Sequence, residues 1–216
     1  MWTPKKKLLF RGRSPASLEY LGSQLGQDIS SFTLSAFNNG GNLFGPPDLG
    51  QVILVVCGAN SGSTGAFTSC SVAGLSASMV TPSISSETPC AVFVAAVPRI
   101  GRGNIVVNAS VALTSQAVGV WRAAWYRDQE VDALAVNISS AQALSAAAGG
   151  MAVGVAGAAS TVPSFTSGLT NRGSLTDSFG YGWRFGDAVG TSPGTMTIDA
   201  TGTSYPLLAA ASFVQV

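Results

Sequence analysis

The stretch Val52-Ile53-Leu54-Val55-Val56-Cys57 decides the fold of this 216-residue chain. Its side chains leave no polar face, so a strand formed here must be buried on both sides. Turn-forming segments bound the run, at residues 45–48 before it and at residues 60–65 after it. The stretch therefore predicts a central β-strand.

Short apolar runs recur roughly every 10 to 15 residues along the rest of the chain, with turn-forming residues between them. The predicted strands are 29–37, 52–57, 67–72, 91–97, 105–113, 118–126, 134–138, 151–158, 181–185, 195–200 and 207–214. Residues 141–148 are rich in Ala, but Gly149-Gly150 follows them at once and favours a loop over a helix. The pattern predicts an all-β fold, a single antiparallel, jelly-roll-like β-sandwich of about ten strands.

Basic residues gather at the N-terminus. Five of the eleven lie there: Lys5, Lys6, Lys7, Arg11 and Arg13. The remainder has more acidic than basic residues, so we predict a basic arm over residues 1–16 and a β-sandwich domain over residues 17–216. Such an arm suits anchoring on an acidic surface, and the alternative is a solvated tail. With few charges and little aromatic interleaving, nucleic acid is not the expected partner.

Only 10% of the residues are charged, against about 25% in typical domains. A surface of Ser, Thr, Asn, Gly and Ala suits packing against copies of the same chain, because interface cores are depleted of charge. We therefore expect a homo-oligomer. Leu8-Leu9-Phe10 is too short for a secretory signal, and no apolar run reaches the length of a membrane helix, so no membrane association is expected.

The chain has no histidine. This excludes a Ser-His-Asp hydrolase, a Cys-His protease and a His-ligated metal centre, and no phosphate-binding GxxxxGK[ST] loop is present. We expect no catalytic residue, no cofactor and no metal site. One cluster leaves an alternative open: Asp128, Glu130 and Asp132 share a face if their segment is extended, which could serve a Ca²⁺ ion or glycoside cleavage. A solvated loop is favoured there.

Aromatic residues are the other candidates for a site. Phe179 and Phe185 bound a stripe of aromatic residues at every second position, and the glycines between them fall on the opposite face. Core packing is the favoured explanation, because aromatic residues dominate cores. The alternative is a platform for sugar rings, whose candidate glycan-binding residues are Trp121, Trp125, Tyr181 and Trp183.

The three cysteines, Cys57, Cys70 and Cys90, are an odd set with irregular spacing, which is not typical of a disulfide framework. Cys57 ends an apolar strand, so a buried free thiol is expected there. Cys70 and Cys90 pair only if their strands are adjacent. This cysteine usage favours a reducing cytoplasm.

The order of the motifs resembles a known family. A Phe-Thr-Leu strand over residues 31–37 leads to Val52-Ile53-Leu54-Val55-Val56, a Gly/Ser loop and Cys70-Ser71-Val72-Ala73-Gly74-Leu75-Ser76-Ala77. Then come AVFVAAVP at 91–98, IVVN at 105–108 and VGVWR at 118–122. Over residues 29–216 this is similar to the Ala/Val/Gly-rich structural proteins of tailed bacteriophages and phage-like gene transfer agents.

The resemblance implies a virion component, assembled in the bacterial cytoplasm: a head spike base, a decoration protein or a tail fibre module. It implies capsid or tail proteins and a spike fibre protein as partners, and it supplies no catalytic residues. Our first expectation is a non-enzymatic, oligomeric structural protein tethered by residues 1–16. The alternative is a carbohydrate-binding adhesion module for host surface polysaccharide, and a third is a carboxylate-based hydrolase.

Overall fold

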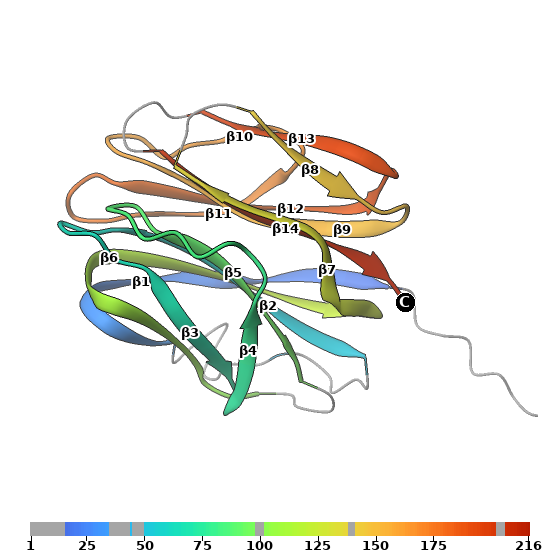
Figure 1. The fold of residues 1–216 in the computed structure, drawn as a ribbon, viewed down its shortest axis with the longest axis horizontal. Helices are drawn as coiled ribbons and strands as arrows, with labels where there is room; N and C mark the ends of the chain where they lie inside the picture. Colours follow the sequence, from blue (N-terminus) through green and yellow to red (C-terminus); the bar gives the residue numbers. More distant parts are fainter. Residues whose placement is uncertain (1–15, 35–43, 45–49, 98–101, 138–140, 202–205) are drawn as a thin grey trace, which may run out of the picture.

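The chain folds into β-strands joined by short connections (Figure 1). The computed structural model describes residues 16–34, 44, 50–97, 102–137, 141–201 and 206–216. These residues form fourteen strands in three sheets, all of their strand pairs are antiparallel, and they contain no helix. The all-β prediction is confirmed. The single sandwich of about ten strands is not, because the strands build a barrel and two further sheets.

The first sheet closes on itself. Its strands are β1 (Ser17–Leu34), β2 (Gln51–Asn60), β3 (Phe67–Val72), β4 (Leu75–Met79), β5 (Cys90–Ala96) and β6 (Ile105–Ala124). They pair in the order β1-β6-β2-β5-β4-β3, and β3 pairs again with β6. Closure follows from the length of β6: its second half pairs with β2, between Ser115 and Ala124, and its first half pairs with β3. Five strands thus form a barrel, and β1 lies outside it on β6.

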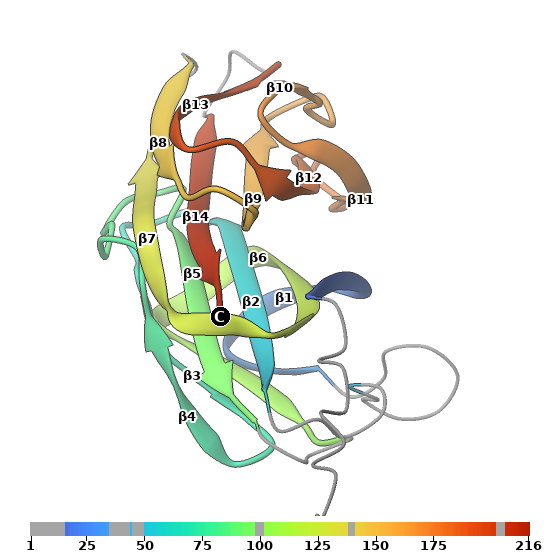
Figure 2. The ribbon, with the colours of Figure 1, turned by 90° about the vertical axis from the view of Figure 1, so that its right-hand side faces the viewer.

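Two more sheets stack on one side of the barrel (Figure 1, Figure 2). The middle sheet has five strands, in the order β11 (Thr170–Thr176), β12 (Gly182–Thr191), β9 (Gly150–Ala158), β14 (Leu207–Gln215) and β7 (Tyr126–Val136). The outer sheet has three, in the order β10 (Phe165–Ser167), β13 (Gly194–Ala200) and β8 (Gln142–Ala146). Counting two walls for the barrel, the described chain is four β-layers thick.

Alternation along β2 divides its side chains between two cores. Ile53 and Val55 point into the barrel core, which also contains Phe93, whereas Val52 and Leu54 pack in the inter-sheet core between barrel and middle sheet. The whole of Val52–Cys57 is buried, which confirms the prediction of a central strand covered on both faces.

Strands β9 and β14 repeat this arrangement in the middle sheet. Val153 and Ala209 belong to the inter-sheet core, whereas Ala156 and Leu208 face an outer core shared with Ile198 of β13. The small residues of β9 allow this close layering. A Cβ on Gly154 would stand 2.8 Å from Cδ1 of Leu169, so the backbone there is in direct contact with its neighbours.

The predicted strands differ from the observed ones where polar residues interrupt or replace the apolar pattern of a strand. The predictions 105–113 and 118–126 are one strand, β6, because buried Ser115 and Gln116 interrupt its apolar run. The loop predicted over 141–148 contains β8. Strand β11 was missed because its residues are mostly exposed and polar, as suits an edge strand.

Gly119 of β6 lies where the barrel packs against Phe185 of the middle sheet. A Cβ on Gly119 would overlap Cδ1 of Phe185 and stand 2.8 Å from its Cε1. We predict that Gly119→Ala lowers the free energy of unfolding by about 1–3 kcal/mol, because overpacking outweighs the gain in strand propensity. Urea denaturation measures the change. In a Phe185→Leu background the cost of the same substitution should be smaller.

Gly62 is the matched control for this prediction, because a Cβ there would lie 3.7 Å from Oγ1 of Thr114. Gly62→Ala should be nearly neutral. Equal destabilisation by the two substitutions would contradict the close packing described at Gly119.

Candidate functional site

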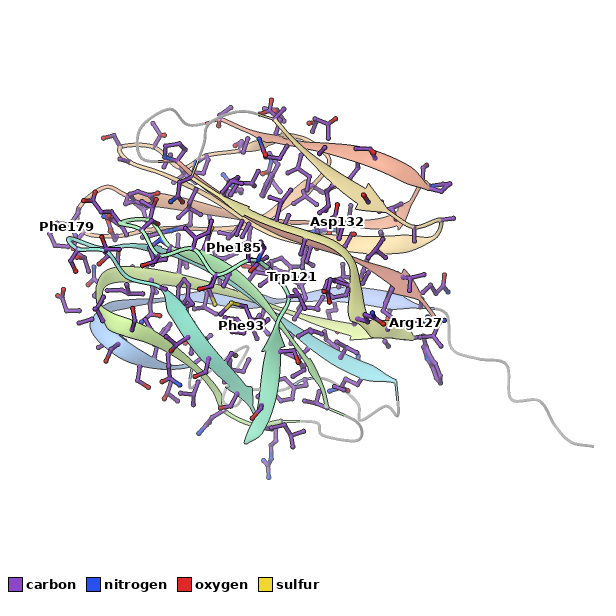
Figure 3. The ribbon with its side chains drawn as sticks, in the orientation of Figure 1. Phe93, Trp121, Arg127, Asp132, Phe179 and Phe185 are labelled. Atoms are coloured by element: carbon purple, nitrogen blue, oxygen red, sulfur yellow. The ribbon has the colours of Figure 1, made fainter. Side chains whose placement is uncertain are left out.

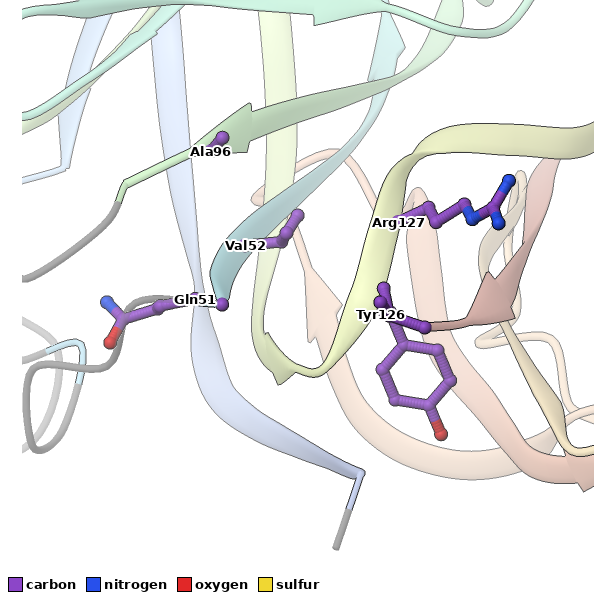
Figure 4. A pocket seen from close by; sticks show the side chains of 7 residues that line it. Gln51, Val52, Ala96, Tyr126 and Arg127 are labelled. Atoms are coloured by element: carbon purple, nitrogen blue, oxygen red, sulfur yellow. The ribbon is translucent and has the colours of Figure 1, made fainter. Parts of the chain in front are cut away.

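An open hollow of about 270 Å³ lies at the end of the layers where β6 gives way to β7 (Figure 4). It gathers residues from β2, β5, β7 and the C-terminus: Gly50, Gln51, Val52, Ala96, Tyr126, Arg127 and Val216. The chain comes together here because β2 begins, β5 ends and β14 ends at this edge of the stack. Trp125, one of the aromatic residues proposed from the sequence, packs on Gly50 at the rim of this hollow.

Trp125 is the corner at which the chain passes from the barrel to the middle sheet. Its φ of 65° lies in the left-handed region, which bulky residues rarely occupy. Two backbone hydrogen bonds hold the corner: the Trp125 N–H donates to the carbonyl of Gly50 at 3.1 Å, and its carbonyl accepts from the N–H of Val216 at 2.8 Å. The indole packs over Gly50, where a Cβ would come within 3.3 Å of Cε3. Trp125 is therefore rigidly placed and half-buried.

Tyr126 and Arg127 leave the start of β7 in different directions (Figure 4). Tyr126 is buried in the inter-sheet core, and burial raises the pKa of its phenol. Arg127 is exposed and forms no ion pair with any side chain that the structure describes. The hollow thus offers one guanidinium beside an apolar wall. This combination suits binding of an aromatic or anionic group rather than bond cleavage, which needs a positioned nucleophile or acid–base pair.

Asp187 of β12 is the most enclosed charge in the described chain. Its carboxylate accepts a hydrogen bond from Nε1 of Trp121 at 2.8 Å and from Nε of Arg172 at 2.9 Å, and Nη2 of Arg172 is 2.8 Å away. The side chain of Asp187 is 3% exposed, and that of Arg172 is 44% exposed. Hydrogen bonding to Asp187 raises the pKa of Arg172. The cluster ties β6 of the barrel to β11 and β12, so its role is structural.

Two further acids also tie layers together. The carboxylate of Asp177 accepts the Ser115 hydroxyl at 2.6 Å and the N–H groups of Phe179 and Tyr181 at 2.9 and 2.8 Å. Asp132 accepts the N–H of Ser145 at 2.7 Å, which joins β7 to β8. Each carboxylate is thus used inside the fold.

The predicted cluster of Asp128, Glu130 and Asp132 is divided by these contacts. Asp132 is bonded within the fold, Glu130 is exposed on β7, and the side chain of Asp128 lies outside the described structure. Among the residues described, no three His, Cys, Asp or Glu side chains are placed to hold a metal ion.

Core packing, the favoured explanation of the aromatic stripe, is confirmed for Tyr181, Trp183 and Phe185, and the alternative of a sugar-stacking platform is wrong for them. Trp121, Tyr181 and Trp183 are 0%, 3% and 0% exposed and pack in the inter-sheet core, so their rings are not available to a ligand. Of the four candidates only Trp125 keeps part of its surface. Phe179 was predicted to share the face of Tyr181, yet it is 68% exposed at the tip of the turn between β11 and β12 (Figure 3). The alternation begins only with the strand, so sequence spacing could not place Phe179.

The basic residues of the arm and the three cysteines are the remaining residues singled out from the sequence. Lys5, Lys6, Lys7, Arg11 and Arg13 lie outside the described residues. Cys57, Cys70 and Cys90 are all buried and free, which confirms the expected thiol at Cys57. Cys70 and Cys90 do not pair: β4 separates β3 from β5, and the two thiols lie in different cores.

Comparison with models of protein families and with curated proteins finds no match for this chain. Within the residues that the structure describes, no helix is long and apolar enough to cross a membrane. The function proposed for this chain therefore follows from its geometry and from the resemblance of its sequence motifs to those of phage structural proteins.

We predict that Asp187→Asn lowers the free energy of unfolding by about 1–3 kcal/mol, because it removes a charged acceptor from two buried hydrogen bonds while Arg172 retains partial solvation. Urea denaturation tests this. Asp199→Asn is the control: its carboxylate contacts the Thr166 hydroxyl at the exposed surface, at 3.2 Å, so its effect should stay below about 0.5 kcal/mol. An unchanged stability in Asp187→Asn would contradict a tie between the layers.

The buried thiols make a prediction about alkaline pH. Burial raises the pKa of Cys70 and of Cys90 to about 12, from an ordinary value of 9.0, because it disfavours the thiolate. The folded state favours the neutral thiol, so this contribution to stability is complete below pH 9 and is lost as pH rises toward 12. At pH 9 the native chain should therefore show little thiolate absorbance and react slowly with a thiol reagent.

The control for this titration is the urea-unfolded chain, in which all three thiols should react at once. If any thiol of the native protein reacted as fast as in the unfolded chain, that cysteine would be accessible to the reagent, which would contradict the burial of all three thiols.

Proposed function

We propose that this chain is a non-enzymatic structural component of a phage-like particle, a head spike base or decoration protein that associates with its own copies. The observation that carries the proposal is the use of three acids inside the fold, of which Asp187 and Asp177 are buried and Asp132 is half-buried. Asp187, Asp177 and Asp132 each join two β-layers. Their hydrogen-bonding capacity serves cohesion of the stack and is not directed at a ligand.

The exterior supports the same proposal. Charged residues make up only 10% of the chain, and the described Arg172 and Arg122 are already paired with acids. A surface of this composition loses little on being covered by a neighbour, because few charges need desolvation. The motif order resembles that of structural proteins of tailed bacteriophages and gene transfer agents, and this resemblance favours capsid or tail proteins and a spike fibre protein as the neighbours.

The proposed location is the virion, with assembly in the bacterial cytoplasm. Three buried free thiols in one small chain fit folding in a reducing compartment. The arm of residues 1–16 is the proposed tether, through Lys5, Lys6, Lys7, Arg11 and Arg13 on an acidic particle surface.

A carbohydrate-binding adhesion module for host surface polysaccharide is the second candidate. Trp125 favours it, because this half-buried residue packs on Gly50 at the rim of the hollow and lies two residues before exposed Arg127. Aromatic faces with a few polar groups are typical of sites for small polar ligands. Polysaccharide binding by the full chain that Trp125→Ala abolishes without unfolding would favour this candidate over a purely mechanical role.

A variant without the positive charges of the arm tests the proposed virion tether. We expect that replacing its five basic residues by Gln in the full-length chain abolishes incorporation into particles, because the electrostatic attraction to the particle is lost. Immunogold labelling of particles purified from producing cells measures incorporation. The triple variant Lys5→Arg, Lys6→Arg and Lys7→Arg keeps the charge of the arm and should be incorporated into particles normally.

Two results would contradict the proposal in different ways. Normal incorporation of the Gln variant would refute the tether alone. Absence of the unmodified chain from purified particles would refute the virion role itself.

A further inference from the structure

We infer that Phe179 of one copy inserts into the hollow beside Trp125 and Arg127 of the next copy. The chain then associates head to tail through two different surfaces at its opposite ends. This inference rests on the proposed self-association and names the contact that produces it.

The turn between β11 and β12 holds Phe179 in a position suited to insertion into another copy. Phe179 is 68% exposed, on a turn closed by two backbone hydrogen bonds between Asp177 and residues Gly180 and Tyr181. The Asp177 carboxylate accepts the N–H of Phe179 from inside the turn, and Gly180 supplies the left-handed φ of 82°. An aromatic ring on a preorganised turn loses little conformational freedom on binding, which is typical of interface hot spots.

A second strand braces this turn from outside. Nε2 of Gln27 of β1, which lies opposite Ser115 of β6, donates to the Ser178 hydroxyl at 3.1 Å. The Ser115 hydroxyl holds the Asp177 carboxylate from below. The turn is therefore bonded to β1 and β6 as well as to itself, and Phe179 remains exposed at this end of the molecule (Figure 3).

The open hollow has room for a phenyl ring. Its volume is about 270 Å³, whereas a cavity of about 150 Å³ already holds benzene in a well-studied protein. Val52, Ala96 and Val216 give it an apolar wall, and Val216 is itself 52% exposed. Arg127 has no described ion-pair partner, so its guanidinium can lie over an inserted ring.

The two surfaces cannot meet within one chain. Ser115 of β6 touches the Asp177 turn, and Trp125 borders the hollow. The intervening strand spans about 30 Å at the ordinary rise per residue. Figure 3 accordingly places Phe179 and Arg127 at opposite ends of the molecule. Contact between them joins two copies, and a heterologous contact of this kind closes into a ring or continues as a filament.

Charge favours the head-to-tail direction. Asp28 follows Gln27 at the Phe179 end and is exposed, and Arg127 is exposed at the other end. Neither forms an ion pair with a side chain in the described structure. Head-to-tail contact brings Asp28 of one copy toward Arg127 of the next, whereas contact between two Phe179 ends brings two Asp28 carboxylates together.

Two variants of the full-length chain test this inference. Phe179→Ser removes the anchor at an exposed position, and Ala96→Trp fills the hollow. Sedimentation velocity over a concentration series should show association of the unmodified chain, and each variant should raise the dissociation constant by at least about tenfold. Phe179→Tyr keeps the ring and should associate normally. Leu75→Ser is the matched control, because Leu75 is a 40% exposed apolar residue on the β3–β4 hairpin.

Mixing the two variants gives the decisive result. The Phe179→Ser chain keeps its hollow and the Ala96→Trp chain keeps its anchor, so an equimolar mixture should form dimers and nothing larger. The inference would be overturned if the Phe179→Ser chain associated as strongly as the unmodified chain. It would also be overturned if the mixture failed to dimerise, or if the unmodified chain were monomeric. Circular dichroism confirms that both variants are folded.

Failure here is separable from failure of the proposed function. A monomeric chain that still enters particles would end this inference and leave the virion role standing. A chain that forms the mixed dimer but is missing from particles would do the reverse.

Discussion

Burial of β2, β5, β9 and β14 on both faces is the constraint on which this structure depends. Each of these strands gives alternate side chains to two different cores, so it needs a layer above, a layer below and a paired strand on each edge. Antiparallel sheets usually leave one face to water. Here the barrel supplies the lower layers and the outer sheet supplies the upper one.

That arrangement restricts where polar groups can lie. A carboxylate inside the stack is tolerated only if its oxygens are bonded, because an unpaired buried charge is strongly destabilising. Asp187 and Asp177 satisfy this condition through partners on other strands. Their bonds cross between layers, so they also fix how the barrel is oriented against the middle sheet. Hydrophobic packing alone is non-directional and does not fix this orientation.

The sequence predicts most strands with two buried faces, since their apolar runs admit few other structures. It does not predict the closure of the barrel, which depends on β6 bonding β2 with one half and β3 with the other. Polar Ser115 and Gln116 divide β6 into two apparent strands. Their buried polar groups are bonded by residues far away along the chain, Asp177 for Ser115 and the Ile29 carbonyl for Gln116. Edge strands such as β11 have no apolar signal to detect.

The candidate site shows the same limit. Trp125 was identified from its residue type, but the hollow beside it joins four distant segments, which no local pattern contains. The aromatic stripe predicted the core position of Tyr181, Trp183 and Phe185 and missed Phe179, because a turn rather than a strand sets the direction of that ring.

The long strand β6 gives the molecule a mechanical direction. Its second half runs from the Asp177 turn to the Trp125 corner with β1 along one edge and β2 along the other. Hydrogen bonds in such ladders lie perpendicular to the strands. Tension between the two ends would therefore shear many of them simultaneously, whereas a sideways pull on β1 would unzip them one after another. The chain is built to be stiff when stretched along this axis and weaker when peeled across it.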